Sequence, residues 1–481
     1  MTAPEGPLVV GVDSSTQSTK ALVVDCATGD VVARGQSPHT VTGTGGARES
    51  DPEQWWQALS EALQQCGAAA GRAKAIAVGG QQHGLVTLDT AGRPVRPAML
   101  WNDVRSAPQS ERLIGQLGAD TWAERTGSLP GPAMTVTKWA WLLENEPDAA
   151  RATAAVRLPH DYLTERLTGR GTTDRGDASG TGWWATRTQA YDEEILRLAG
   201  LSPALLPEVV DPSKAAGSVR RVPGLPLAPG IAVAPGTGDN AAAALGLGLR
   251  PGRPVLSLGT SGTVYAVSQR RPVDPSGTVS GFADARGDWL PLACTLNCTL
   301  AVDRIAALLH LDRDAVEPGG DSVMLPFLGG ERTPHLPHAA GLLYGLRHDT
   351  TGGQLLQAAY DGAVYALLDA LDRVLDEDAA PDEPLLLIGG GAQGTAWRET
   401  VRRLSGRPVK VPLAKELVAI GAAAQAAGLL LGEDPIAVAR RWDTARGPRY
   451  APLPPDEPAL QRISTTLSDA GSLLRREEHR G

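Results

Sequence analysis

Short apolar runs rich in β-branched residues alternate with longer stretches of helical periodicity along the whole chain. The first run, 9–12, ends in a small polar turn and is followed by a second apolar run, 21–25, which predicts a β-hairpin. The pattern then predicts a strand near 31–33, an amphipathic helix over 52–63 with Asp51 at its N-cap, and strands over 75–78 and 85–88. This alternation is typical of an α/β protein.

The same beginning recurs in the second half of the chain. Residues 254–267 again read as strand, small polar turn and strand, followed by a predicted long helix over 353–375. A strand over 385–388 then enters a glycine-rich turn, and a helix is expected to begin near Thr395. Because the two halves share few identical letters, we interpret the repeat as a duplication of fold. A boundary within 246–251 divides the chain into domains 1–246 and 247–481, and the tail after Gly447 is expected to form a peripheral helix.

Composition is consistent with two globular domains. A chain of 481 residues is too long to fold around one ordinary hydrophobic core, so we expect two domains of roughly 200–250 residues. The net charge of −9 argues against nucleic acid or an anionic membrane as the main partner. The first residues lack the basic segment of a signal peptide, and no apolar run reaches the roughly 18 residues of a membrane helix, so we expect a cytoplasmic protein. Cys294 and Cys298 are interpreted as free thiols, because no second Cys/His pair lies near them in sequence.

Two carboxylates stand out for their surroundings. Asp13 and Asp239 each follow an apolar run, at a turn of glycine and small polar residues. A carboxylate beside a hydroxyl-rich turn suits a Mg²⁺–phosphate site, since Mg²⁺ prefers oxygen ligands and keeps several waters. A carboxylate in a glycine-rich turn suits a base that deprotonates an attacking hydroxyl. Together they indicate phosphoryl transfer from a nucleotide to an alcohol.

The two hairpin turns are candidate phosphate sites. Ser14, Ser15 and Thr16 form the first turn, and Gly259 and Thr260 begin the second. Successive backbone N–H groups and hydroxyls in such turns can bind phosphate oxygens. Hydroxyl side chains also favour turns for purely local hydrogen bonding, so each turn alone has a structural alternative.

A third glycine-rich element matches a dinucleotide fingerprint. Gly389, Gly391 and Gly394 follow a predicted strand and open a helix, so a Rossmann dehydrogenase must be considered. Two features count against it: the motif comes late in the chain, and no acidic residue ends the following strand, 409–411, to bind a ribose. A nucleoside seat fits better, since glycine lets the backbone approach a ligand closely.

Many motifs together resemble one family. They are the Asp13 hairpin, 80–84, 100–103 with Arg105, 159–163, 177–181, 238–242, 257–262 and 330–335, followed by Gly341, Leu343, Gly345, Leu346, Gln354, Leu355, Ala358, Ala359 and Asp361. In this order they resemble the FGGY carbohydrate kinases over nearly the whole chain, most closely the xylulokinase branch. One departure is Gln82, where xylulokinases commonly have methionine before His83-Gly84.

The resemblance implies two actin-like (ribonuclease H-like) ATPase domains, with ATP, Mg²⁺ and a sugar in the cleft between them. It implies that Asp239 is the general base and that Asp13 and Asp239 lie at the metal. The residues it implies for the sugar are Gln82, His83, Asp103, Asp239 and Asn240. Those implied for ATP are Ser14, Ser15, Thr16, Gly259, Thr260, Gly390, Gly391 and Gln393. The implied reaction is ATP-dependent phosphorylation of a ketopentose, D-xylulose to D-xylulose 5-phosphate.

Several alternatives stay open at this point. Asp103 and Arg105 could form a simple surface ion pair, His83 could merely satisfy backbone groups, and Asp177 could form a turn or contact substrate. The substrate could be ribulose, L-xylulose, gluconate or a polyol instead. An actin-like ATPase that uses the nucleotide as a switch is the rival from another class, and a homodimer is also left open.

Overall fold

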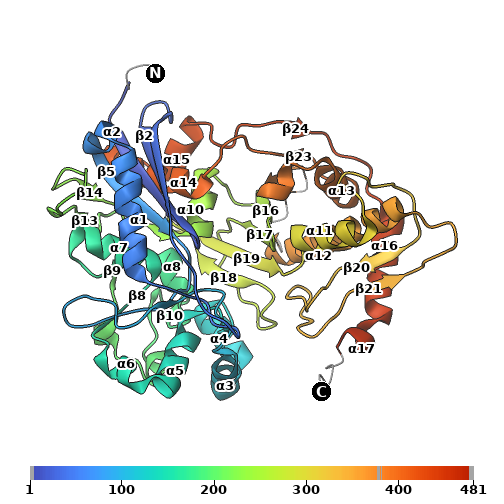
Figure 1. The fold of residues 1–481 in the computed structure, drawn as a ribbon, viewed down its shortest axis with the longest axis horizontal. Coiled ribbons are helices and arrows are strands. Elements are labelled where there is room, and N and C mark those ends of the chain that lie inside the picture. Colours follow the sequence, from blue (N-terminus) through green and yellow to red (C-terminus); the bar gives the residue numbers. More distant parts are fainter. Residues whose placement is uncertain (1–4, 376–379, 381, 476–481) are drawn as a thin grey trace.

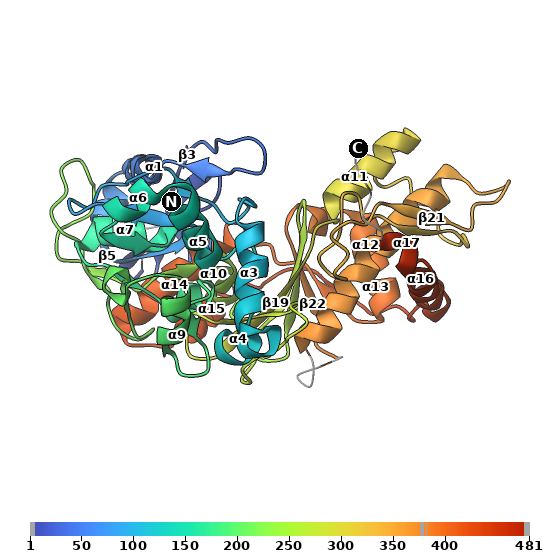
Figure 2. The same cartoon turned by 90° about the horizontal axis from the view of Figure 1, so that it is seen from below.

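Two mixed β-sheets, each covered by helices, form the two lobes of the molecule (Figure 1). The structure is a computed structural model, and it describes residues 5–375, 380 and 382–475 of the 481-residue chain. Viewed from below, strands β19 and β22 of the second sheet lie between the helices of the first lobe and helices α12 and α13 of the second (Figure 2).

The first sheet has the strand order β13-β14-β5-β1-β2-β3, with β15 also pairing with β5. Its strands are β1 (Leu8–Ser14), β2 (Ser18–Asp25), β3 (Val31–Pro38), β5 (Ala73–Gly80), β13 (Gly217–Ser218), β14 (Ala232–Val233) and β15 (Thr237–Gly238). Strands β1, β2 and β3 are antiparallel neighbours, whereas β1, β5 and β14 run parallel. The hairpin and third strand expected from the sequence are therefore confirmed.

The second sheet repeats this arrangement. Its order is β18-β19-β17-β16-β22-β23-β24, formed by β16 (Pro254–Leu258), β17 (Gly262–Ala266), β18 (Ser280–Ala283), β19 (Trp289–Thr295), β22 (Leu385–Ile388), β23 (Val409–Lys410) and β24 (Arg449–Tyr450). Strands β19, β17 and β16 are antiparallel neighbours, and β16, β22 and β23 run parallel. In order and direction, β19, β17, β16, β22 and β23 correspond to β3, β2, β1, β5 and β14 of the first sheet. The predicted duplication of fold is therefore confirmed.

Helices cover both faces of the first sheet because alternate residues of its strands are apolar on each side. Val10 and Val12 of β1 pack with α1 (Pro52–Gln65) and α7 (Pro159–Thr168), whereas Val9 belongs to the core on the opposite face. Helix α1 begins as the sequence predicts: the Asp51 side chain accepts a hydrogen bond from the backbone N–H of Glu53 at 3.0 Å.

The opposite face is covered by α10 (Asp239–Gly246) and by α14 (Leu417–Leu431), with α15 (Pro435–Arg441) packed behind them. Helix α14 comes from far beyond residue 246, yet it lies against β1 and β5 of the first lobe (Figure 1). The close packing of α14 on β1 and on α10 requires glycine at the contacts. A Cβ at Gly11 of β1 would overlap the carbonyl oxygen of Ala419, and a Cβ at Gly421 of α14 would overlap that of Ala242. The sequence did not indicate this packing.

The remaining elements complete the two lobes. Between β5 and β13 the chain forms β6 (Val86–Leu88), β7 (Ala98–Met99), α3 (Ala107–Leu117), α4 (Ala119–Thr126), α5 (Thr135–Asn145), α6 (Pro147–Ala152), β8 (Ala155–Arg157), β9 (Thr172–Thr173), α8 (Arg175–Ser179), β10 (Trp184–Ala185), β11 (Ala190–Tyr191), α9 (Glu193–Leu198) and β12 (Glu208–Val209). The second lobe adds α11 (Thr299–Leu309), β20 (Val323–Leu325), β21 (Leu342–Tyr344), α12 (Gly352–Leu375), α13 (Thr395–Ser405), and the tail helices α16 (Glu457–Asp469) and α17 (Gly471–Leu474). The helices predicted near 353–375, from Thr395 and in the tail are thus confirmed.

No single described helix has the length and apolar character to cross a membrane, and only the bent pair α14 and α15 meets those criteria when taken together.

Candidate active site

Parallel pairing brings Asp13 and Asp239 to the same edge of the first sheet. Strand β5 lies between β1 and β15, and its Gly79 is in register with Asp13 on one side and Thr237 on the other. Both neighbours run parallel to β5, so their carboxyl ends meet at one edge. The charge of Asp13 raises the pKa of Asp239, so the two acids lie close enough to interact. The structure therefore brings together two carboxylates that stand 226 positions apart in the sequence.

Asp13 is a buried carboxylate with one unused oxygen. Its Oδ2 lies 3.8 Å from Nζ of Lys20, whereas Oδ1 has no hydrogen-bond partner. Burial raises its pKa to about 6, an effect opposed by Lys20 and reinforced by Glu416. An unsatisfied buried carboxylate oxygen is costly, and a cation is the partner that it lacks.

Asp239 is the first residue of α10 and retains part of its surface accessible. The N-cap is Gly238, so Asp239 does not act as the N-cap of this helix. Its Oδ1 accepts hydrogen bonds from the backbone and side-chain N–H groups of Asn240, at 2.8 and 3.0 Å. Desolvation, and then the charge of Asp13, raise the pKa of Asp239 to about 7. A base with a pKa near neutrality is well matched to proton abstraction at physiological pH.

The donor set fits a magnesium ion that is held mainly by its other ligands. No group of three or more acidic, histidine or cysteine side chains suited to a metal occurs among the described residues. Mg²⁺ in phosphoryl-transfer sites is typically bound through one or two carboxylates plus waters and substrate phosphates. Asp13 and Asp239 supply that number of hard oxygen ligands, and the free Oδ1 of Asp13 is the clearest candidate ligand atom.

Two of the predicted sugar residues, Gln82 and Asn240, lie beside Asp239. The Nδ2 of Asn240 donates to Oε1 of Gln82 at 3.0 Å, and a Cβ on Gly238 would meet the Gln82 side chain at 2.5–2.7 Å. Gln82 therefore lies across the turn that carries the candidate base.

His83 follows directly, in a left-handed conformation with φ of 65°. Its Nδ1 lies 2.8 Å from the carbonyl oxygen of Gly180, and its ring is 5.4 Å from that of Phe282 on β18. Burial, and then the charge of Lys138, lower the pKa of His83 to about 3, so the ring is neutral. Since a carbonyl only accepts, Nδ1 carries the proton and Nε2 is left as an acceptor for a hydroxyl. The interpretation that His83 satisfies a backbone group is thus correct for one nitrogen and leaves the other free for a ligand.

Asp103 is not part of a surface ion pair. Its side chain is 0% exposed, and its oxygens accept hydrogen bonds from the backbone N–H of Arg48 at 2.9 Å and from the Arg105 guanidinium. Burial opposes ionisation here, but the hydrogen bonds from Arg105 and Arg48 hold the pKa of Asp103 below its usual value. Arg105 also bonds Glu49. Both oxygens already have protein partners, so a contact between Asp103 and a sugar stays a prediction.

A buried charged cluster lies behind the site, and only its Asp177 received a candidate role from the sequence. His160 Nδ1 bonds Asp177 Oδ2 at 2.7 Å, and Asp161 and Asp174 lie 3.5 and 3.6 Å from its Nε2. Burial opposes the charged ring, but the three acids raise the pKa of His160 to about 10, so it is a cation. Asp174 also accepts a hydrogen bond from Thr237 at 2.7 Å. Asp177 therefore contacts His160 rather than standing free for a substrate, and the signal was the acid spacing around 159–163 and 174–177.

The first phosphate turn uses its hydroxyls locally. Ser14 bonds Thr19 at 3.1 Å, Ser15 donates to the carbonyl oxygen of Ser18 at 3.0 Å, and Thr16 accepts from the indole of Trp101 at 3.1 Å. These contacts match the structural alternative for the side chains. Roles for Ser14, Ser15 and Thr16 at a phosphate stay predictions.

The glycine turns of the second lobe lie side by side. A Cβ on Gly389, whose φ is 84°, would lie 2.8 Å from the carbonyl oxygen of Leu258, and a Cβ on Gly391 would lie 2.8 Å from the Leu258 side chain. The 259–260 turn therefore adjoins the short helix formed by Gly390–Gln393. Gly389 and Gly391 therefore pack too closely against Leu258 to carry a side chain, whereas a Cβ at Gly390 would face open space. ATP contacts by Gly259, Thr260, Gly390, Gly391 and Gln393 stay predictions.

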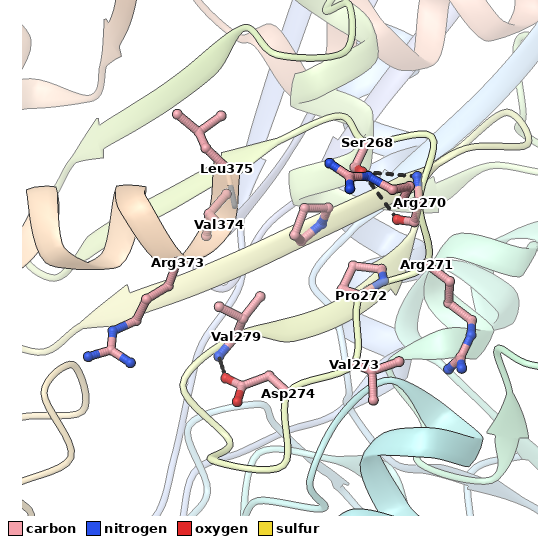
Figure 3. A pocket seen from close by; sticks show the side chains of 11 residues that line it. Ser268, Arg270, Arg271, Pro272, Val273, Asp274, Val279, Arg373, Val374 and Leu375 are labelled. Carbon is pink, nitrogen blue, oxygen red and sulfur yellow. Dashed lines mark hydrogen bonds between the residues drawn. The ribbon is translucent and has the colours of Figure 1, made fainter. Parts of the chain in front are cut away.

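A separate surface hollow of about 480 Å³ lies beside the end of α12 and strand β19 (Figure 3). Its lining includes Arg271, Asp274 and Arg373 but none of the predicted site residues. Arg271 bonds Glu124 at the end of α4, so this region joins the two lobes rather than forming the active site.

Sequence comparison decides the family. Models for the N-terminal and C-terminal domains of the FGGY family of carbohydrate kinases match residues 8–246 and 255–429. The chain belongs to this family. The protein is therefore a sugar kinase, with a sugar and ATP as its substrates, and its glycine fingerprint belongs to a kinase domain. The dehydrogenase and switch-ATPase interpretations are wrong.

Known relatives agree with this family. The chain is 74% identical over 478 residues to the xylulose kinase of Streptomyces coelicolor, covering 99% of both chains. It is 34% identical to the xylulose kinase of Escherichia coli over 418 residues, covering 83% of this chain and 85% of the relative. Among solved structures, xylulose kinase from Bifidobacterium adolescentis superposes with a TM-score of 0.84 at 37% identity, covering 96% of this chain and 99% of the other. The predicted two-domain kinase fold is thus confirmed.

Proposed function

We propose that this kinase transfers the γ-phosphoryl group of ATP to the terminal primary hydroxyl, O5, of D-xylulose, giving D-xylulose 5-phosphate. The observation that carries the substrate is the 74% identity to a xylulose kinase over 99% of both chains. The geometry is consistent with it, because the candidate base Asp239 interacts with Asp13 and bonds Asn240, whose side chain in turn bonds Gln82, the neighbour of His83.

Asp239 is the general base of the proposed reaction. Its partly accessible carboxylate accepts from Asn240 through Oδ1, and Oδ2 can accept the proton of a sugar hydroxyl placed within hydrogen-bond distance. The raised pKa makes the carboxylate more basic than an ordinary aspartate, which favours proton transfer from an alcohol as its oxygen attacks phosphorus.

Asp13 serves the nucleotide side of the same site. Mg²⁺, when bound with ATP, neutralises charge on the β- and γ-phosphates. Asp13 would hold that ion through Oδ1, while Lys20 at 3.8 Å from Oδ2 keeps the carboxylate oriented. The Ser15 N–H already donates to the carbonyl oxygen of Ser18, so the N–H groups of Thr16 and of the 259–260 turn would bind the phosphate oxygens.

Sugar recognition rests on groups with fixed hydrogen-bonding direction. Nε2 of His83 can only accept, because Nδ1 donates to Gly180. The amides of Gln82 and Asn240 are oriented by their mutual bond. A ketopentose whose hydroxyl has the wrong configuration would leave such a group unpaired, at about 1–3 kcal/mol for each buried group.

A coupled ADP-release assay tests the substrate. The purified enzyme is given D-xylulose, D-ribulose, L-xylulose or gluconate at saturating MgATP, with Asp239→Asn protein as the blank. We expect D-xylulose to have the highest kcat/KM. A higher kcat/KM for another substrate would refute D-xylulose and leave the sugar-kinase family intact. A cytoplasmic location and a homodimer stay predictions.

A further inference from the structure

One buried side chain holds the loop that carries the candidate base. Gln425 of α14 is 3% exposed, and its amide pairs with both backbone groups of Gly236. The Gly236 N–H donates to Oε1 at 2.9 Å, and Nε2 donates to the Gly236 carbonyl oxygen at 3.1 Å. Gly236 lies three residues before Asp239, whereas Gln425 lies 189 positions away in the sequence.

Gly236 needs such a partner because of its conformation. Its φ of 78° takes it out of the sheet ladder, and a buried N–H and C=O without partners would be costly. A Cβ at this position would lie 2.5 Å from the carbonyl oxygen of Val78 and 2.7 Å from the His160 ring, so only glycine fits. A side-chain amide is one of few groups that can accept from the N–H and donate to the C=O at once.

The loop is also held from its other side. Thr237 donates to Asp174 at 2.7 Å, so consecutive residues are fixed by α14 and by the segment that precedes α8. Helix α10 begins only two residues later, with Asp239. A small rotation of the Gly236 peptide would therefore change the direction in which the Asp239 carboxylate points.

We propose that Gln425 is a positioning residue for phosphoryl transfer. By pairing with both backbone groups of Gly236, it fixes the direction in which α10 presents Asp239 to the sugar hydroxyl. The inference rests on the proposed function of Asp239 as the base. A displacement of about 1 Å in a reacting group can cost on the order of 10²-fold in rate, so loss of this contact is expected to appear in kcat.

The primary test is Gln425→Met, which keeps the side-chain length and removes both hydrogen bonds. We expect kcat to fall about 10- to 100-fold, with KM for ATP within about threefold of wild type, since the nucleotide turns are untouched. The matched control is Gln357→Met on α12, another buried glutamine whose Nε2 bonds Asp361 and Thr400. This control should lower the melting temperature and leave kcat unchanged.

A double-mutant cycle with Asp239→Asn separates positioning from general damage. If Gln425 acts through the base, Gln425→Met should add little to the loss already caused by Asp239→Asn. The inference would be overturned if the kcat of the double variant fell by the full product of the two single-variant losses. It would also be overturned if Gln425→Met alone kept a kcat within twofold of wild type. If Gln425→Met does not fold, Gln425→Asn takes its place. This variant keeps a buried amide, but its side chain is one methylene too short to reach both the N–H and the carbonyl oxygen of Gly236. The same changes in kcat are then expected, and the same results would overturn the inference.

Failure of the proposed base is distinguishable from failure of this inference. Near-normal turnover by Asp239→Asn alone would move the base elsewhere and remove the basis of both. Normal turnover by the Gln425 variants, with Asp239→Asn inactive, would overturn only the positioning role.

Discussion

The pH dependence of turnover follows from the surroundings of Asp239. Desolvation and the nearby Asp13 both disfavour a second negative charge, and they raise the pKa of Asp239 to about 7. Only the ionised carboxylate can accept the proton of the sugar hydroxyl. Activity should therefore be lost as the pH falls through about 7 and should reach a plateau above it.

The size of the effect follows from the fraction ionised. With a pKa of about 7, roughly 1% of Asp239 is ionised at pH 5, so kcat/KM should be about 100-fold below its plateau there. The profile is measured by coupled ADP release with both substrates subsaturating, so that it reports the free enzyme. Saturating MgATP would place a cation near Asp13 and shift the limb to lower pH.

Asp239→Asn provides the control, since an amide has no proton to gain or lose in this range. We expect turnover about 10²- to 10⁴-fold below wild type, and a residual rate without the acidic limb. Unchanged kcat/KM in the wild type between pH 7 and 5 would refute this reasoning. If the acidic limb of the pH profile persisted in Asp239→Asn, the titrating group would be one other than Asp239.

Three further perturbations test other parts of the site. Asp13→Ala should raise the Mg²⁺ concentration needed for half-maximal activity and reduce kcat strongly; unchanged Mg²⁺ dependence at normal activity would remove Asp13 from the metal. His83→Ala should lower kcat/KM for the sugar by about 10-fold or more with little change in KM for ATP, because Nε2 is an acceptor on the sugar side; equal effects on both substrates would contradict this. Gly391→Ala places a Cβ 2.8 Å from the Leu258 side chain and should lower the melting temperature by several degrees, whereas Gly390→Ala, with open space around it, should not; calorimetry on the two variants decides.

Local sequence patterns specified several strands of both sheets, four of the helices and the likeness of the two halves. The hairpin turns at Asp13 and Gly259, the Asp51 cap and the strand entering Gly389 need only hydrophobic periodicity and short-range hydrogen bonds. These signals lie within a few residues of one another, so they can be recognised without the fold. The candidate base and metal carboxylate were found in the same way, from the turns that carry them.

Tertiary structure alone decided how those elements act together. Parallel pairing across β5 brings Asp13 beside Asp239, although the two residues are far apart in the chain. Burial raises the pKa of both carboxyl groups, and the charge of Asp13 raises that of Asp239 further. Packing of α14 on the first sheet places Gln425 against Gly236, and burial of Asp103 turns an apparent surface pair into an internal one. The sequence itself dictates local conformation through neighbouring residues, whereas desolvation and long-range contacts depend on which distant segments share a core.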